Sequence, residues 1–150
     1  MVMSSTDTPQ SQFVHLAFVS QESIKQIEVV FPDLLSWPES WMGDEDDLPA
    51  GNLALGVFIQ YLTHLMEKGR ASSTVKKHGD YLWALGGEII RDTCESGFDQ
   101  SLSAHDLVLG YVDSLGGPYW RHASAEDDQQ QYDSVCRALY RFLYITQSNR

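Results

Sequence analysis

The sequence lacks long hydrophobic runs. The longest apolar segment, residues 53–59, is far shorter than the ~20 apolar residues needed to span a bilayer. No basic segment followed by an apolar one opens the chain, as a secretory signal would. We therefore expect a cytoplasmic protein with no membrane partner. Cysteine is also scarce, because Cys94 and Cys136 are too few for a disulfide framework, and we expect both thiols to be reduced and buried.

Basic residues are few compared with acidic ones. Ten lysines and arginines stand against 21 acidic residues, which gives a net charge of −11. This charge opposes non-specific attraction to phosphates, since affinity for nucleic-acid backbones comes largely from Lys and Arg that displace counterions. The imbalance is uneven, because residues 1–67 carry −9, residues 68–91 carry +3 and residues 92–150 carry −5. A local basic region can still meet DNA if the acidic residues lie elsewhere.

Patterns typical of catalytic or metal sites are missing. No histidine has the i, i+4 spacing to another histidine or to a cysteine, and there is no Cys-x-x-Cys pair. Gly86-Gly87 and Gly116-Gly117 lack the flanking residues of a phosphate-binding glycine loop. The acidic runs at 44–47 and 126–128 fit a solvated loop and the first turn of a helix. We therefore predict no enzyme activity, no metal and no cofactor.

The length of 150 residues and the ordinary globular composition predict one folded unit with its own core. We expect residues 1–49 to form an N-terminal extension. It would comprise a mobile tail over 1–12, a short apolar segment over 13–19, a helix over 21–31 that Pro32 stops, and the acidic loop. Residues 50–150 form the helical domain.

Four segments of the helical domain repeat apolar residues at the 3.6-residue period of an α-helix. The first follows Asn52 as N-cap and ends near Gly69, and the second runs from Ser72-Ser73-Thr74, whose hydroxyls can cap it, to about Arg91. The third begins at Ser103 and buries Leu107, Tyr111, Val112 and Leu115, and the fourth begins near Ser124 and buries Tyr132, Val135, Cys136, Leu139, Phe142 and Leu143. The fold class is therefore all-α, a small four-helix bundle with an N-terminal helical or extended extension.

Two glycines interrupt the second of these helices. Gly86 and Gly87 each cost about 1 kcal/mol relative to alanine inside a helix. We expect close packing or a bend at this point.

Four short motifs over residues 50–147 resemble one known family. They are Phe58-Ile59-Gln60-Tyr61-Leu62, the turn and helix start at 69–75, the segment at 103–112, and Arg137-Ala138-Leu139-Tyr140-Arg141-Phe142-Leu143. Together they resemble the N-terminal, SAM-like core-binding domain of tyrosine recombinases and phage integrases. The resemblance implies a bundle that clamps one face of duplex DNA with its second and fourth helices. The family's catalytic residues belong to a separate domain, for which no chain follows Arg150, so we expect no strand cleavage.

The candidate DNA-binding residues lie at the start of the second helix. Hydroxyls and amides at a helix N-terminus, next to cationic side chains, are the groups that bind phosphate. The candidates are Lys68, Arg70, Ser72, Ser73, Thr74, Lys76 and Lys77, to which the resemblance adds Arg137 and Arg141. The expected function is a non-catalytic domain of a mobile element that binds duplex DNA or a DNA-bound recombinase. The simpler interpretation of the same residues is solvated helix charges and an ordinary N-cap.

Two alternatives remain open at this point. The chain would be an acidic interaction module, or an inhibitor that imitates the charge of DNA, if Asp44, Glu45, Asp46 and Asp47 bind a basic protein. It would be a self-associating fragment if Trp37 and Trp41 are exposed. The choice between DNA and a basic protein depends on whether the acidic residues lie away from Lys76 and Lys77.

Overall fold

The computed structural model describes residues 21–148 and is built from helices, with no β-strand in that range. The helices are α2 (Gln21–Val30), α3 (Trp37–Trp41), α4 (Leu48–Glu67), α5 (Ser72–Ser96), α6 (Ala104–Leu109) and α7 (Glu126–Ser148), with 3₁₀ helices at Leu34–Ser36 and Glu45–Asp47. The predicted all-α class is confirmed. The tail at 1–12 and the apolar segment at 13–19 lie outside the described residues.

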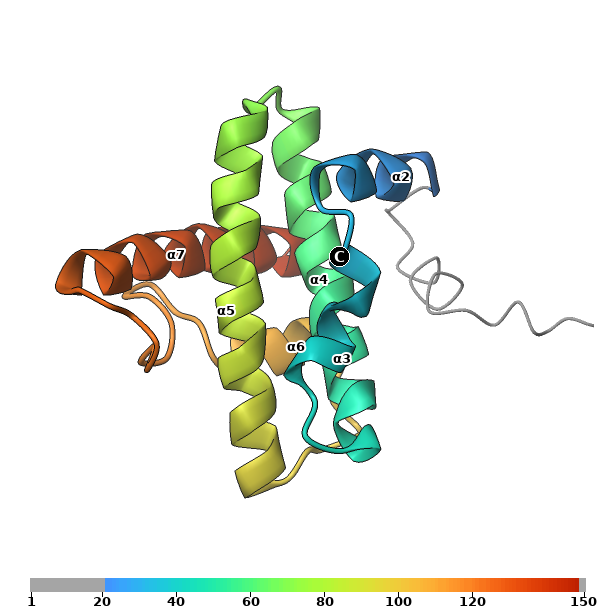
Figure 1. The fold of residues 1–150 in the computed structure, drawn as a ribbon, viewed down its shortest axis with the longest axis vertical. Helices are drawn as coiled ribbons and strands as arrows, with labels where there is room; N and C mark the ends of the chain where they lie inside the picture. Colours follow the sequence, from blue (N-terminus) through green and yellow to red (C-terminus); the bar gives the residue numbers. More distant parts are fainter. Residues whose placement is uncertain (1–20, 149–150) are drawn as a thin grey trace, which may run out of the picture.

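Helix α4 is the centre of the molecule. It forms an antiparallel hairpin with α5 and also packs against α2, α3 and α6 (Figure 1). Residues 54–63 are buried without interruption, as expected for a helix that is covered on all sides. No helix within residues 21–148 is both long and apolar enough to cross a membrane.

The N-terminal helices belong to the same core as the hairpin. Ile24, Ile27 and Phe31 are buried on one face, as the sequence predicts, and Trp37 is buried beside them. The edge of the Phe31 ring meets the Trp37 ring, with centroids 5.7 Å apart. Residues 21–49 therefore dock on the helical domain, and the buried Trp37 does not offer a surface for self-association.

Helix α7 crosses behind α5 and α4 at a steep angle (Figure 1). Its predicted core residues are buried, except that Phe142 is only partly covered. It contacts α5 and α6, and so it links these two helices.

Several helix limits differ from the prediction. Helix α4 begins at Leu48, with Pro49 in its first turn, so Asn52 is not its N-cap. The prediction was wrong because proline suits the first helical turn as well as a loop. Helix α5 runs on to Ser96 and ends at Gly97, whose φ of +93° leaves the helical region.

Two further corrections concern α5 and α6. The N-cap of α5 is Ala71, and no side-chain hydrogen bond caps this helix, so the hydroxyls of residues 72–74 do not have the predicted role. Helix α6 is capped by Ser103 as predicted, but it ends at Leu109. Leu115 is 82% exposed instead of buried, because the chain turns at 113–116 instead of continuing as a helix.

Gly86 provides space for an aromatic ring. A Cβ at this position would come within 3.0 Å of three ring atoms of Trp41. The expected close packing is therefore confirmed at Gly86, where it holds α3 against α5, whereas a Cβ at Gly87 would lie 3.7 Å from Trp41, an ordinary contact distance.

Candidate functional site

Four cationic side chains surround the turn between α4 and α5, and we call them the turn surface: Lys68, Arg70, Lys77 and Arg141. All but Arg141 belong to the turn or the start of α5, whereas Arg141 comes from α7. The charges of Arg70 and Arg141 both act on the Tyr61 phenol, in the direction that lowers its pKa. Two arginines far apart in the sequence thus lie within electrostatic range of the same phenol.

An aromatic cluster brings α7 to this turn. The Tyr61 hydroxyl and His78 Nδ1 form a 2.9 Å hydrogen bond across the α4–α5 hairpin. The Phe142 ring packs on Tyr61 and on His64, with centroids 5.5 and 4.8 Å apart. Because Arg141 directly precedes Phe142, this packing fixes its position beside the turn.

The aromatic cluster itself is uncharged at neutral pH. Burial raises the pKa of Tyr61 to about 12, so the phenol keeps its proton. Burial, together with nearby Lys and Arg charges, lowers the pKa of His64 and of His78 below the ordinary value of 6.5. The positive charge of the turn surface therefore comes from its lysines and arginines.

Two of the sequence-predicted cations have other contacts. Lys76 Nζ lies 2.6 Å from Asp80 Oδ1 and 5.5 Å from the centre of the Phe31 ring. Arg137 donates a 3.3 Å hydrogen bond to the Leu115 carbonyl. The four side chains of the turn surface, by contrast, have no ion pair within the part of the chain whose side chains are described.

The predicted hydroxyl residues stand at the start of α5. Ser72 and Ser73 are exposed and Thr74 is partly buried. The Thr74 amide bonds to the Ala71 carbonyl at 3.0 Å, but the amides before it have no partner within the helix, and no side chain caps this helix. These amides lie between Arg70 and Lys77 in the chain, where they can donate to an anion.

Several acidic residues lie at the other end of the hairpin, where α4 begins and α5 ends. Asp44, Glu45 and Asp46 precede α4, Glu95 lies in the last turn of α5 and Asp99 follows that helix, and all five are exposed. The 20 residues of α4 separate the two ends by ~30 Å, well beyond the screening length of ~8 Å at physiological salt. Near the turn surface, Glu67 is exposed at the end of α4, Asp80 pairs with Lys76, and Asp33 lines a pocket together with Lys76 and Asp80.

Asp47 is not part of a solvated loop. Its Oδ2 accepts hydrogen bonds from the backbone N–H groups of Gly43 and Asp44, at 2.8 and 3.2 Å, and its side chain is buried. With Asp44 it forms a capping box around the 3₁₀ helix that leads into α4. Of the four acidic residues proposed to bind a basic protein, only Asp44, Glu45 and Asp46 are therefore available to a partner.

Asp47→Ala is expected to lower the free energy of unfolding by about 1–2 kcal/mol, because two backbone N–H groups lose their acceptor. Asp46→Ala, at an exposed neighbour, should change it by less than about 0.5 kcal/mol. Urea unfolding followed by circular dichroism measures both. Equal losses in the two variants would contradict the structural role of Asp47.

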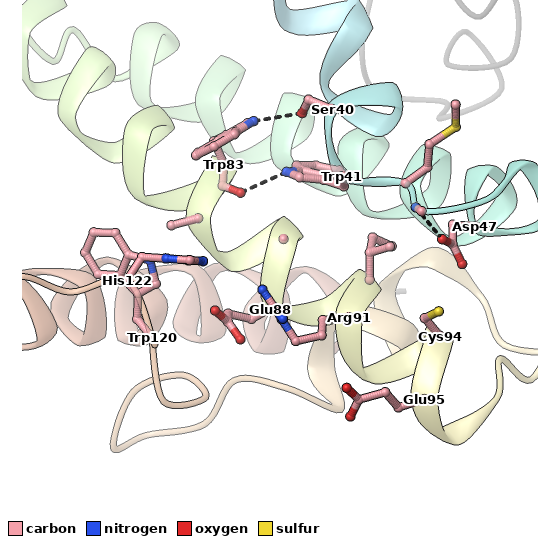
Figure 2. Close-up of a pocket in the computed structure, with 15 residues that line it drawn as sticks. Ser40, Trp41, Asp47, Trp83, Glu88, Arg91, Cys94, Glu95, Trp120 and His122 are labelled. Atoms are coloured by element: carbon pink, nitrogen blue, oxygen red, sulfur yellow. Dashed lines mark hydrogen bonds between the residues drawn. The ribbon is translucent and has the colours of Figure 1, made fainter.

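A cavity of about 570 Å³, which the sequence does not predict, opens between α3, α5 and the segment before α7 (Figure 2). Trp41, Trp83 and Trp120 line it. Trp41 Nε1 donates to the Trp83 carbonyl at 3.0 Å, and Trp83 Nε1 donates to Ser40 Oγ at 3.0 Å. These hydrogen bonds fix two of the three indole rings.

Cys94 also lines this cavity and is exposed, whereas Cys136 is buried as expected. The prediction that Cys94 is buried was wrong. Helix α5 extends five residues beyond Arg91, so Cys94 lies within this helix, on its exposed side. No group of three His, Cys, Asp or Glu side chains within residues 21–148 is placed to hold a metal ion.

Comparison with known proteins assigns no family to the chain. No protein-family model, no curated protein and no solved structure matches it.

Proposed function

We propose that this protein is a non-catalytic DNA-binding domain that holds the phosphate backbone of a duplex with its turn surface. The observation that carries the proposal is that Arg70 of the turn and Arg141 of α7 both lie within electrostatic range of the Tyr61 phenol. Both are exposed, and both are remote from the acidic end of the hairpin. A protein with net charge −11 thus still presents a cationic surface to a polyanion.

The chemistry of the turn surface suits phosphate. Lysine and arginine side chains without an internal ion pair are free to displace counterions from a duplex. The uncapped first amides of α5 and the hydroxyls of Ser72 and Ser73 can donate hydrogen bonds to phosphate oxygens. Contacts of this kind position a protein on DNA without reading its sequence.

The resemblance to recombinase core-binding domains supports the same surface. The four resembling segments fall on α4, the turn into α5, α6 with the residues after it, and α7. The family's second and fourth helices face DNA, and here α5 and α7 both contribute to the turn surface. We accordingly propose a SAM-like bundle from a mobile element, acting on DNA directly or beside a DNA-bound recombinase.

The acidic end favours a second candidate function. Asp44, Glu45 and Asp46 are exposed and close together, as a site for a basic protein requires. On this alternative the chain binds no duplex at any salt concentration. It instead captures a basic protein, and neutralising these three side chains weakens the capture.

Titration of a labelled random duplex, followed by fluorescence anisotropy between low and physiological salt, tests the proposal. Four phosphate contacts predict that the logarithm of the binding constant falls with the logarithm of salt concentration with a slope of about −3.6. A slope of this size supports the turn surface. Absence of binding even at low salt would contradict DNA binding and favour the acidic alternative.

A further inference from the structure

The tryptophan-lined cavity has the dimensions of a small-molecule site. Its volume of about 570 Å³ lies within the range of roughly 300–1,000 Å³ that is typical of ligand pockets. Figure 2 shows Glu88 and Arg91 extending from the side of α5 that faces away from the Trp41–Trp83 pair, with Trp120 and His122 beside Glu88. The cavity is distant from the turn surface, since Glu88 lies 16 residues, or ~24 Å, along α5 from Ser72.

Glu88 is a largely buried carboxylate that lines this cavity. Its side chain is 8% exposed, and a buried carboxylate requires hydrogen-bond donors or a close cation. The nearest cation, Arg121, places its Nε 3.7 Å from Glu88 Oε1 and is itself half exposed. This distance is too long for a hydrogen bond, and Glu88 receives none from any other residue within 21–148.

The other charges around the cavity also favour a cation. Asp47, Glu88 and Glu95 line it, against Arg91 as the one full positive charge in the lining and the imidazole of His122. Arg91 is exposed, so water screens its charge, whereas the charge of Glu88 is largely shielded from solvent. The faces of tryptophan rings attract cations in addition.

We propose that this cavity binds a small protonated aromatic amine. Its ammonium group donates hydrogen bonds to the Glu88 carboxylate, and its ring packs among the indoles of Trp41, Trp83 and Trp120. The ammonium supplies N–H donors at hydrogen-bond distance, which Arg121 at 3.7 Å does not. This proposal is independent of DNA binding.

Isothermal titration calorimetry with 2-phenylethylamine tests the charge of the ligand, with 3-phenylpropionate as the anion that carries the same ring on a similar chain. The amine is expected to bind and the anion is not. Binding of the anion as tight as that of the amine, or tighter, would overturn the proposal and assign the cavity to Arg91. This comparison uses the unaltered protein and does not depend on how any variant folds.

Glu88→Gln tests the assigned residue. The variant keeps the shape of the side chain and removes its charge, so the affinity for 2-phenylethylamine should fall at least about tenfold. Glu67→Gln, the same change at an exposed carboxylate outside the cavity, should leave the affinity unchanged. Equal affinity in Glu88→Gln and the unaltered protein would refute the site.

Cys94 offers a second readout, because it lines the cavity and is exposed. Saturating 2-phenylethylamine should slow alkylation of this thiol by iodoacetamide, while 3-phenylpropionate should not. An unchanged rate in the presence of bound amine would place the amine elsewhere on the protein and contradict the proposal.

Discussion

Replacing Gly86 by alanine is expected to lower the free energy of unfolding by about 2–3 kcal/mol, since overpacking a close contact carries a cost of this order. The added methyl group would overlap three ring atoms of Trp41. The ring cannot move aside easily, because its N–H is bonded to the Trp83 carbonyl and its faces and edges pack near Trp37 and Phe58, with centroids 6.1 Å away in both cases. The change should therefore loosen α3 from α5.

Gly87→Ala is the matched control in the same helix. A methyl group there would lie 3.7 Å from the nearest Trp41 atom, an ordinary contact distance. Alanine should stabilise the helix by up to about 1 kcal/mol. In thermal unfolding, Gly86→Ala should lower the midpoint by ~5–10 °C and Gly87→Ala should keep or raise it. Equal losses in the two variants would mean that Trp41 does not lie on Gly86.

Reversing two charges of the turn surface, in Arg70→Glu/Arg141→Glu, is expected to weaken binding to a random duplex about 100-fold at low salt. Each charged hydrogen bond contributes about 1.5 kcal/mol, and the pair is lost together. The slope of binding against salt should become shallower by about 2, one for each lost phosphate contact. Anisotropy titrations of the unaltered and variant proteins measure both quantities.

Arg91→Glu/Arg121→Glu controls for the change in net charge. Both residues are exposed and lie beside the cavity, away from the turn surface. Their reversal changes the net charge by the same amount but should leave the salt slope unaltered. If this pair weakens binding as much as Arg70→Glu/Arg141→Glu does, the effect belongs to overall charge and the turn surface is not the binding site.

Features that depend on local sequence were predictable. The 3.6-residue period gave the buried face of α7, and Ser103 marked the start of α6, where its Oγ accepts a hydrogen bond from the Asp106 amide at 3.1 Å. Gly86 signalled close packing because a glycine inside a helix has a cost that some contact must offset. Each of these signals lies within a few residues along the chain.

Features that depend on distant residues were not predictable in the same way. The uninterrupted burial of residues 54–63 requires α2 and α3 on one side of α4, and nothing within α4 reveals that coverage. Lys76 and Lys77 look alike in the sequence, yet the helical turn directs Lys76 to Asp80 and Phe31. Trp41, Trp83 and Trp120 come from separate segments with no shared spacing, so the cavity emerges only from the fold.

The contribution of both Arg70 and Arg141 to the turn surface was predictable only in part. The resemblance to core-binding domains pointed to the second and fourth helices, but it named Arg137 together with Arg141. The structure separates the two, because the Arg137 guanidinium reaches the Leu115 carbonyl, whereas Arg141 acts on Tyr61. Side-chain contacts, rather than helix order, decide which arginine joins the turn surface.

Chemical-shift mapping by ¹H–¹⁵N NMR, during titration with a short random duplex at low salt, tests the central claim most directly. DNA binding through the turn surface predicts that the largest shifts fall on residues 68–77 and on the part of α7 around Arg141. Amides at 44–46 and around the cavity should change little. Shifts centred on the acidic end, or no shifts at all, would contradict the proposed interface.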